Sequence, residues 1–276
     1  CPPANHGDEE GFQMKERHLL ALSGGKDSAA LAVYMREKYA DLPMEYVFID
    51  SGCELPETYA YLDKLRAILG IEIITIRSRR NFEYWLKMFK GVLPAPRNRW
   101  CTRLLKLDPY ADWLKNNCKE IMVFNYAGLR ADEDRTGYQS KSDRVTSKFP
   151  FVNDGLGLED VKKILVESAL GLPEYYAWRQ RSGCYFCFYQ RDNEWRGLRR
   201  YHPTLFEKAC VMEENHADGR SYTWRDSGFL RDLSEGGDLT PPESSAGRPT
   251  IINTLSNLTI EPISGNYFRK QGGCYD

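Results

Sequence analysis

Ser23-Gly24-Gly25-Lys26-Asp27-Ser28 is the stretch that decides the fold of this chain. It comes directly after the apolar run 18–22 and directly before a helical stretch at 29–39. A strand, a glycine turn and a helix start, in this order, bring several backbone N–H groups and the positive end of the helix dipole to one point. The sequence therefore predicts a cradle for a phosphate group at this junction.

Every position of this hexapeptide suits an anion-binding role. The two glycines tolerate positive φ and let the backbone come close to an anion. Lys26 adds a full charge, while Ser23 and Ser28 add hydroxyl donors. Asp27 can hold Mg²⁺ or orient the loop. The alternative is an ordinary glycine-rich turn with a serine or aspartate N-cap. The spacing is not that of the Walker A motif, which needs four residues between its glycines.

The hexapeptide resembles the PP-loop of N-type ATP pyrophosphatases, and later motifs resemble their phosphoadenosine phosphosulfate (PAPS) reductase-like branch. The resemblance covers residues 18–215. That branch includes the small subunit of ATP sulfurylase and the sulfur-transfer proteins of DNA phosphorothioation. Its members cleave ATP between the α and β phosphates, or bind a related adenylyl nucleotide such as PAPS or APS. The resemblance therefore implies an adenine nucleotide with Mg²⁺ as the ligand of the hexapeptide.

Short apolar runs alternate with amphipathic stretches in the first half of the chain. The expected strands are 18–22, 47–49, 71–76 and 121–124, and the expected helices are 29–39, 56–69, 81–90, 102–117 (interrupted near Asp108-Pro109), 158–170, 194–200 and 204–214. Strands that alternate with helices form a parallel sheet covered on both faces. We therefore expect an α/β fold with a three-layer, doubly wound, mostly parallel sheet, followed by a cysteine-rich helical segment. The resemblance implies the adenine nucleotide alpha hydrolase-like version of this fold, with its ligand beyond the carboxyl ends of the strands.

Length and composition predict how the chain is organised. With 276 residues and 42% apolar content, it can bury one substantial core. We expect a disordered leader at 1–16, a PP-loop nucleotide-binding domain at 17–180, a cysteine-containing helical segment at 181–233, a flexible linker at 234–249 and a C-terminal tail at 250–276. The leader lacks an apolar signal core and no run of 18 apolar residues exists, so we expect no membrane segment. Eight cysteines without a secretion signal favour metal or redox chemistry in the cytoplasm over a disulfide framework.

Charge is balanced overall but uneven locally. The net charge of −1 creates no whole-chain attraction to nucleic acid or membrane. Between positions 77 and 106, however, there are nine basic residues and a single acid, Glu83. The basic residues are Arg77, Arg79, Arg80, Lys87, Lys90, Arg97, Arg99, Arg103 and Lys106. Such a run is either a solvated face or a surface that meets a polyanion.

A polar turn, Asp50-Ser51-Gly52, ends the expected second strand, and Glu54 follows it. The resemblance implies that Asp50, Ser51 and Gly52 line the nucleotide pocket, so that Asp50 and Glu54 contact ribose or metal. The alternative is a solvent turn with an N-cap carboxylate.

A charged loop after the fourth strand contains Arg130 and Arg135. The resemblance implies that both contact the phosphates or the sulfate, and the planar guanidinium binds oxyanions through two parallel hydrogen bonds. The intervening Asp132, Glu133 and Asp134 offer the alternative of surface ion pairs.

The stretch that contains Cys101-Thr102, Lys106 and Pro109 matches the Cys-Thr-x-x-x-Lys-x-x-Pro block of the same branch. Arg103 and Lys106 lie one helical turn apart, so both can present charge to one anion. The resemblance implies that Arg103 contacts the nucleotide and that Lys106 is catalytic.

Cys184 and Cys187 have the C-x-x-C spacing that grips one tetrahedral metal ion or one edge of a cluster. We favour a [4Fe–4S] cluster over Zn²⁺, by analogy with sulfur-handling relatives. A thioredoxin-like redox pair and two buried structural cysteines are the alternatives.

The other ligands are less well defined by the sequence. The resemblance brings Cys101 to the C-x-x-C motif as third ligand. Cys274, in the glycine turn of the tail, is our first choice for the fourth, followed by Cys210 and Cys53.

These motifs predict ATP pyrophosphatase or adenylyltransferase chemistry, in which an acceptor attacks the α-phosphate and Mg²⁺-pyrophosphate leaves. Lys26, Lys106 and Arg130 neutralise the phosphates, and Asp27 helps to hold Mg²⁺. One alternative is thiol-dependent reduction of PAPS or APS, although the tail lacks the Glu-Cys-Gly-Leu-His pattern of those reductases. Another is a nucleic-acid-binding module that uses ATP as a switch. The expected partners are an adenine nucleotide, a sulfur-donor or electron-donor protein, and nucleic acid.

Overall fold

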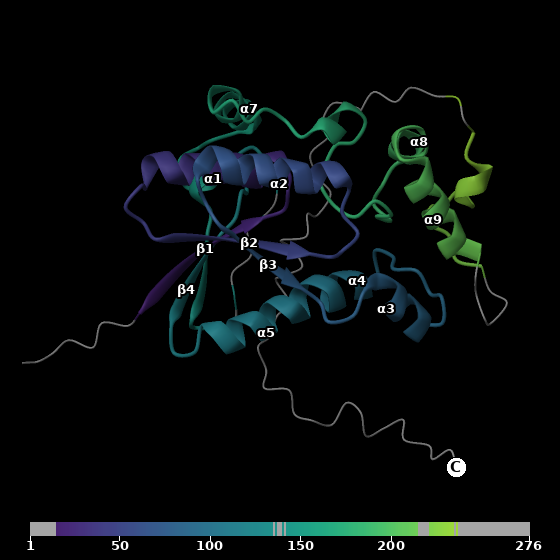
Figure 1. Cartoon of the computed structure of the whole chain (residues 1–276), viewed down its shortest axis with the longest axis horizontal. Coiled ribbons are helices and arrows are strands. Elements are labelled where there is room, and N and C mark those ends of the chain that lie inside the picture. The colour runs from purple at the N-terminus through teal and green to yellow at the C-terminus, as the bar shows by residue number, and fades with distance from the viewer. Residues whose placement is uncertain are drawn as a thin grey trace, which may run out of the picture.

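The computed structural model describes residues 15–134, 136, 140, 142–214, 221–234 and 236. Its centre is a sheet of five parallel strands in the spatial order β3-β2-β1-β4-β5 (Figure 1). The strands are β1 (Glu16–Leu22), β2 (Met44–Asp50), β3 (Ile73–Arg77), β4 (Met122–Tyr126) and β5 (Val145–Lys148). The predicted α/β fold with a doubly wound parallel sheet is confirmed.

The strand order places the hexapeptide at the point where the direction of winding reverses. β1 lies between β2 and β4, and Leu20 faces Tyr46 on one side and Tyr126 on the other. The chain first adds β2 and β3 on one side of β1, then returns to add β4 and β5 on the other. Loops that leave the two sides of such a switch point border a crevice, which is where ligands of these sheets bind.

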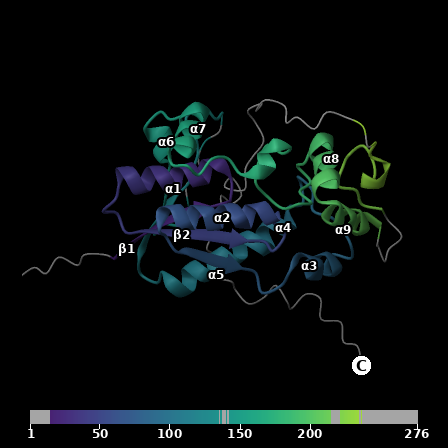
Figure 2. The ribbon, with the colours of Figure 1, turned by 45° about the horizontal axis from the view of Figure 1, so that its top comes forward.

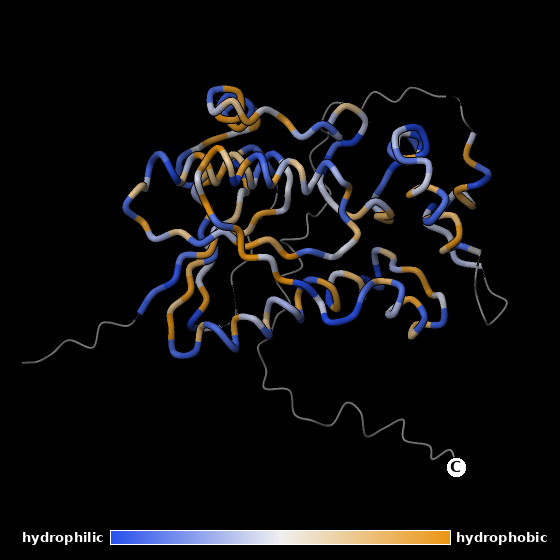
Figure 3. Tube along the Cα trace, in the orientation of Figure 1, coloured by the Kyte–Doolittle hydropathy of each residue, from blue (hydrophilic) through white to orange (hydrophobic). Residues whose placement is uncertain are grey.

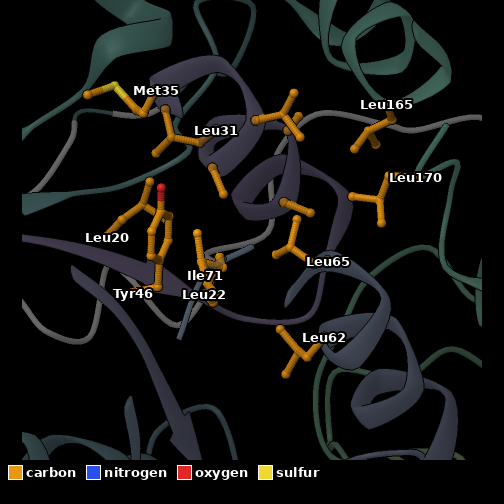
Figure 4. Packing of buried hydrophobic residues seen from close by; sticks show 14 of the residues in the cluster. Leu20, Leu22, Leu31, Met35, Tyr46, Leu62, Leu65, Ile71, Leu165 and Leu170 are labelled. Carbon is orange, nitrogen blue, oxygen red and sulfur yellow. The ribbon is translucent and has the colours of Figure 1, made fainter. Parts of the chain in front are cut away.

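Helices cover both faces of the sheet (Figures 1 and 2). One face carries α1 (Lys26–Lys38), α2 (Pro56–Leu69) and α7 (Leu158–Glu167), with the short α6 (Pro150–Asn153) next to α7, and the other carries α5 (Asp108–Asn117). Hydropathy follows this layering, since hydrophobic segments lie along the strands and alternate with hydrophilic ones along α1 and α2 (Figure 3). The core between them contains Leu20, Leu22, Leu31, Leu62, Leu65 and Leu165 (Figure 4).

Local sequence signals explain where α2 and α3 begin and end. Pro56 stands in the first turn of α2, and Gly70 ends the helix in the left-handed conformation at φ 60°. Asn81 caps α3 (Phe82–Met88) by accepting the Tyr84 N–H at 3.0 Å. The predicted extension of this helix to Lys90 is wrong, because Lys90 itself takes a left-handed φ of 53°.

The helical run 100–117 contains a π-helical turn. It consists of α4 (Trp100–Thr102), the π turn (Arg103–Leu107) and α5. Pro109 stands in the first turn of α5 and has no N–H to continue the helical ladder. The interruption predicted near Asp108-Pro109 therefore takes the form of a widened turn just before the proline. Such turns are frequent at functional sites, and this one carries Lys106.

The last described part packs against the sheet domain through a second core. It consists of a 3₁₀ turn (Glu174–Ala177), α8 (Asp192–Tyr201), α9 (Pro203–Glu214) and a second 3₁₀ turn (Leu230–Asp232). Phe82 and Trp100 from the first part share one buried cluster with Phe186, Trp195 and Trp224. Residues on both sides of position 180 thus share one core. The domain boundary that we predicted at this position remains a prediction.

Other differences from the predicted elements are small. The strand β5, a short and half-polar segment, was not predicted at all. The strands β3 and β4 each lie a little later in the chain than expected, and α7 stops at Glu167 because Ala169 takes a left-handed φ of 58°. Within the described ranges, no helix combines the length and the apolar character needed to cross a bilayer. Arg135, Cys274, most of the predicted leader and linker, and the whole tail lie outside the described residues.

Candidate nucleotide and cysteine site

The glycine turn after β1 has a geometry that only glycine fits. Gly24 has φ +70°, and a Cβ there would lie 2.4 Å from the Thr58 Cγ2 atom. Gly25 is extended at φ −98°, so the expectation of positive φ applies to the first glycine alone. At Gly25 space is the constraint, since an added Cβ would meet the Ser182 Oγ atom at 2.8 Å. The loop is therefore enclosed from two sides, by α2 and by the segment before the C-x-x-C motif.

Residues far along the chain hold this loop in place. The Tyr175 hydroxyl donates to the Gly24 carbonyl at 2.7 Å, and the Ser182 hydroxyl donates to Ser23 Oγ at 3.3 Å. The Lys26 N–H donates to the Tyr176 hydroxyl at 3.4 Å. None of these partners was predicted, because no sequence pattern indicates that tyrosines at 175–176 contact residues about 150 positions earlier in the chain.

Lys26 and Arg130 are joined through one carboxylate, that of Asp27. The Lys26 Nζ atom lies 2.9 Å from Asp27 Oδ2, and the Arg130 NH1 atom lies 2.9 Å from Asp27 Oδ1. The loop after β4 comes this close because Gly128 packs on the Asp27 backbone, where an added Cβ would lie 2.6 Å from the carbonyl oxygen. The structure thus brings together three of the four residues that we predicted to be catalytic, namely Lys26, Asp27 and Arg130.

Acids hold both cations in their charged forms. Burial alone would lower the pKa of Lys26, but Tyr176 and Asp27 raise it overall. The same balance applies to Arg130, whose pKa rises because the charge and hydrogen bond of Asp27 outweigh burial. Arg130 also pairs with Asp132 and Glu133, at 2.8 and 3.1 Å, so the surface-pair alternative and the contact with the loop are both present.

The turn after β2 is built around the Asp50 carboxylate. It accepts from the Gly52 N–H at 2.7 Å, the Tyr59 hydroxyl at 2.8 Å and the Arg77 Nε at 2.7 Å. The Asp50 side chain is completely buried. In this structure Asp50 anchors the turn, and its contact with ribose or metal remains a prediction, as does nucleotide binding by Ser51 and Gly52.

Lys106, the fourth residue predicted to be catalytic, forms a buried ion pair with Glu54. The Nζ atom lies 2.9 Å from Glu54 Oε1, and the two side chains are 12% and 1% exposed. Burial alone would lower the pKa of Lys106, but the Glu54 carboxylate and nearby thiols raise it overall. Ser51 donates to Glu54 at 3.0 Å and contacts the Cys184 sulfur at 3.2 Å. The ammonium group therefore belongs to the surroundings of the cysteines.

Three predicted metal ligands line one cavity of about 140 Å³. They are Cys101, Cys184 and Cys187, and the same cavity is bordered by Ser23 of the hexapeptide and by Ser51. The hexapeptide 23–28, which we call the phosphate loop, and the cysteines thus border one common cavity, which we call the cysteine cavity. Three thiols that line one cavity have the donor chemistry that a [4Fe–4S] cluster or Zn²⁺ requires. Among the described residues, however, no three His, Cys, Asp or Glu side chains are arranged as a ligand set around a metal ion.

The thiols are strongly shielded. Burial raises the pKa of Cys184 to about 12 and that of Cys101 to about 11. A thioredoxin-like redox pair needs the opposite shift, because the thiolate is the reactive form. Metal binding, by contrast, deprotonates coordinating thiols. The alternative of inert structural cysteines is also consistent with these shifts.

Arg179 is a buried cation that was not predicted. It is 2% exposed and donates to the carbonyls of Gly183 and Cys184 at 3.1 and 2.8 Å. No carboxylate within the described ranges forms an ion pair with it, and it also lines the cavity. A buried charge without a counterion favours an anionic occupant beside it. Arg103, in contrast, is exposed and pairs weakly with Asp108 at 3.6 Å.

A parallel α/β sheet with a lysine-bearing glycine loop at its switch point is the arrangement of the PP-loop fold. Comparison with protein families makes this more specific. Residues 17–153 match the phosphoadenosine phosphosulfate reductase domain, and this part of the chain belongs to that family.

Individual relatives are distant. An uncharacterized protein of Methanocaldococcus jannaschii is 27% identical over 206 residues, which are 71% of this chain and 41% of the relative. The chain thus spans less than half of that protein. The PAPS reductase of Candida auris, in a phosphate complex, superposes with a TM-score of 0.48 and 16% identity over 61% of this chain and 81% of that one. The U34-tRNA thiolase NcsA of Methanococcus maripaludis, solved with its [4Fe–4S] cluster, gives 0.41 and 14% over 72% of each chain.

Proposed function

We propose that the protein binds Mg²⁺-ATP at the hexapeptide, cleaves it between the α and β phosphates and activates an acceptor for sulfur transfer. The observation that carries this proposal is the cavity that both Ser23 and the three cysteines border. An enzyme that couples adenylyl transfer to sulfur chemistry needs its phosphate site and its sulfur site within reach of one substrate atom. Membership of residues 17–153 in the PAPS reductase family supports an adenine nucleotide as ligand.

In the first step, an acceptor oxygen attacks the α-phosphorus, and the bond to the β-bridging oxygen breaks. The loop amides and Lys26 stabilise the charge that develops on the leaving pyrophosphate. Arg130 is held beside the loop by its ion pair with Asp27, which also pairs with Lys26. Mg²⁺ leaves with pyrophosphate. The acceptor now carries AMP on its oxygen.

In the second step, hydrosulfide, supplied by a sulfur-donor protein, adds to the activated carbon and AMP leaves, with no net oxidation or reduction. The cysteines Cys101, Cys184 and Cys187 would hold a [4Fe–4S] cluster or Zn²⁺, which would supply a binding site for sulfur. Lys106 and Arg179 keep positive charge beside these thiols, which stabilises anionic sulfur.

The products of ATP cleavage test this proposal. The protein is incubated with Mg²⁺, sulfide and ATP labelled at the α-phosphate, with RNA or DNA as acceptor, and pyrophosphate is measured in a separate assay. We expect AMP and pyrophosphate in equal amounts, and their loss in Lys26→Ala but not in Lys162→Ala, an exposed lysine of α7. Formation of ADP and phosphate would contradict the proposal.

Reduction of PAPS is a second candidate, and the family match favours it. Cys184 and Cys187 would supply two electrons by forming a disulfide, so that PAPS gives sulfite and adenosine 3′,5′-bisphosphate. The raised pKa of the buried Cys184 thiol weighs against this reaction. Sulfite release from PAPS with a dithiol reductant distinguishes it from adenylyl transfer.

A further inference from the structure

An exposed basic surface adjoins the cysteine cavity. It includes the end of β3, the helix α3 and the loop that leads to α4, and these elements lie together on the side of the sheet opposite α1 and α2 (Figures 1 and 2). Its exposed cations are Arg77, Arg79, Arg80, Lys87, Lys90, Arg97 and Arg103. We name this set, together with Tyr84 of α3, the α3 surface.

Most cations of the α3 surface lack a carboxylate partner. Arg77 pairs with Asp50 and Arg103 with Asp108, whereas the other five form no ion pair with any residue in the described part of the chain. Uncompensated charge of one sign is costly to bring together, and natural surfaces usually intersperse acids. An unpaired cluster of this kind is the electrostatic footprint of a polyanion site.

Aromatic and apolar side chains stand among these charges. Tyr84, Met88 and Phe89 are 37%, 59% and 36% exposed. The guanidinium of Arg80 lies over the Tyr84 ring, 4.7 Å from its centroid. Cations interleaved with exposed aromatic rings bind the backbone and the unstacked bases of a single nucleic-acid strand.

The α3 surface is also hollowed, and the hollow shares a lining residue with the cysteine cavity. An open cleft of about 600 Å³ is lined by Arg77, Arg79, Arg80 and Tyr84. Ser51 lines both this cleft and the cysteine cavity. Arg99, a further cation, also lines the cysteine cavity. The exposed cations at 87, 90 and 97 belong to the same surface but do not line the cleft, so the positive charge extends over more than the cleft itself. The arrangement therefore suits a longer chain of phosphates.

We propose that the α3 surface binds an unpaired strand of nucleic acid and directs one of its nucleotides into the cysteine cavity as the acceptor. This inference rests on the proposed function, since it names the acceptor class of the same site. The acceptor atom is then a nucleobase carbonyl oxygen: after adenylylation, hydrosulfide forms a bond to the carbon, and the bond from that carbon to the adenylylated oxygen breaks as AMP leaves.

Binding of fluorescently labelled 20-nucleotide RNA and DNA strands, followed by anisotropy at several salt concentrations, tests the inference. The variant replaces Arg80, Lys87 and Lys90 by alanine. The matched control replaces Lys115, Lys162 and Lys163, which are exposed lysines on α5 and α7. Wild type and control should bind with the same steep salt dependence. The variant should lose at least tenfold in affinity and about 2 from the slope of log K against log salt, since each single-strand phosphate contact contributes about 0.7.

Further binding measurements define the kind of nucleic acid that the α3 surface binds. Tyr84→Ala should weaken strand binding by about tenfold if a base stacks on the ring, and unchanged affinity would overturn the stacking contact. Preference for RNA, for DNA or for neither is compatible with the inference. Tighter binding of a duplex than of its separate strands, binding of ATP with no oligonucleotide binding in about 50 mM salt, or unchanged binding by the triple variant would each overturn it.

ATP binding separates this inference from the proposed function. Calorimetry with Mg²⁺-ATP in the absence of nucleic acid should give the same affinity for wild type and the triple variant. If strands bind at the α3 surface but ATP does not bind, the proposed function fails while the surface assignment stands. If ATP binds and no strand does, only the acceptor assignment fails.

Discussion

Two basic regions of this molecule differ in whether their cations are paired with carboxylates. Around the phosphate loop and the cysteine cavity, Lys26, Arg130 and Lys106 are shielded, and each has a carboxylate within 3 Å. On the α3 surface, exposed cations such as Lys87 and Lys90 have no such partner among the described residues. Built-in acids fix the position of a cation and hold it for one small anion of defined shape. Cations without acids keep their charge available for a long, flexible polyanion.

The largest effect should follow from breaking the buried pair of Glu54 and Lys106. Glu54→Ala leaves the Lys106 ammonium buried without its partner, which typically costs about 3–5 kcal/mol of folding free energy. The counterpart on the α3 surface, Lys87→Ala, should stay within about 0.5 kcal/mol of wild type. Urea unfolding of both variants checks this contrast, and equal stabilities would show that Glu54 and Lys106 do not depend on each other.

A second effect should appear in catalysis. Lys26→Ala removes a charge placed where the leaving pyrophosphate develops its own, and comparable deletions lower turnover about 10²–10³-fold. Lys38→Ala, at the exposed end of the same helix, should keep normal turnover. Pyrophosphate release under saturating ATP is the readout. Normal turnover in Lys26→Ala would remove the phosphate loop from the mechanism.

The cysteine cavity should bind metal more tightly as pH rises. Folded-state pKa values of about 12 for Cys184 and about 11 for Cys101 mean that both thiols are protonated near neutrality. Binding must displace these protons, so affinity should rise up to about tenfold per pH unit for each thiol that ligates. Cobalt titration between pH 6 and 9, followed by thiolate-to-metal absorption, measures the slope. The Cys118→Ala control should match wild type, whereas an affinity independent of pH would exclude these thiols as ligands.

The smallest effect should come from the rim of the phosphate site. Asp132 is 45% exposed, so loss of its pair with Arg130 in Asp132→Asn should cost about 1 kcal/mol or less. Although burial acts in the opposite direction, the hydrogen bond and charge of Arg130 hold the pKa of Asp132 below its usual 3.8. The stability difference should therefore be complete above pH 4 and disappear as pH falls through the lowered pKa. Thermal melts at pH 7 and at several pH values below 3.8 test this, since the difference should shrink steadily as the pH falls, and a difference that stays constant over this range would assign it to another cause.

How far the sequence alone leads depends on how local each interaction is. The strand, the glycine turn and the helix start could be predicted because they are consecutive in the sequence, although Gly25 is extended rather than at positive φ. Phosphate binding at this turn remains a prediction. The fold followed from the alternation of elements. The resemblance associated Cys101 with Cys184 and Cys187, and the three line one cavity, while metal binding by them remains a prediction. The sequence did not reveal that Tyr175 and Ser182 enclose the loop, since those contacts join segments about 150 residues apart.

The same reasoning explains why the surroundings of Lys106 were not predicted. Its described partner is Glu54, which lies 52 positions earlier in the chain, and its role in neutralising phosphate remains a prediction. Charge pairs across such distances depend on which loops the sheet brings together, and no periodicity records that. The strand β5 was overlooked because its Val-Thr-Ser-Lys sequence carries too few apolar residues to show a pattern.

The central claim is that the phosphate loop and the cysteines serve one substrate in one cavity. A crystal structure with Mg²⁺ and an ATP analogue that resists cleavage between the α and β phosphates tests it most directly. We predict that the β and γ phosphates bind the amides of residues 24–28 and that the α-phosphate faces the cavity bordered by Cys101, Cys184 and Cys187. An analogue bound elsewhere, or with its α-phosphate turned away from the cysteines, would contradict the account.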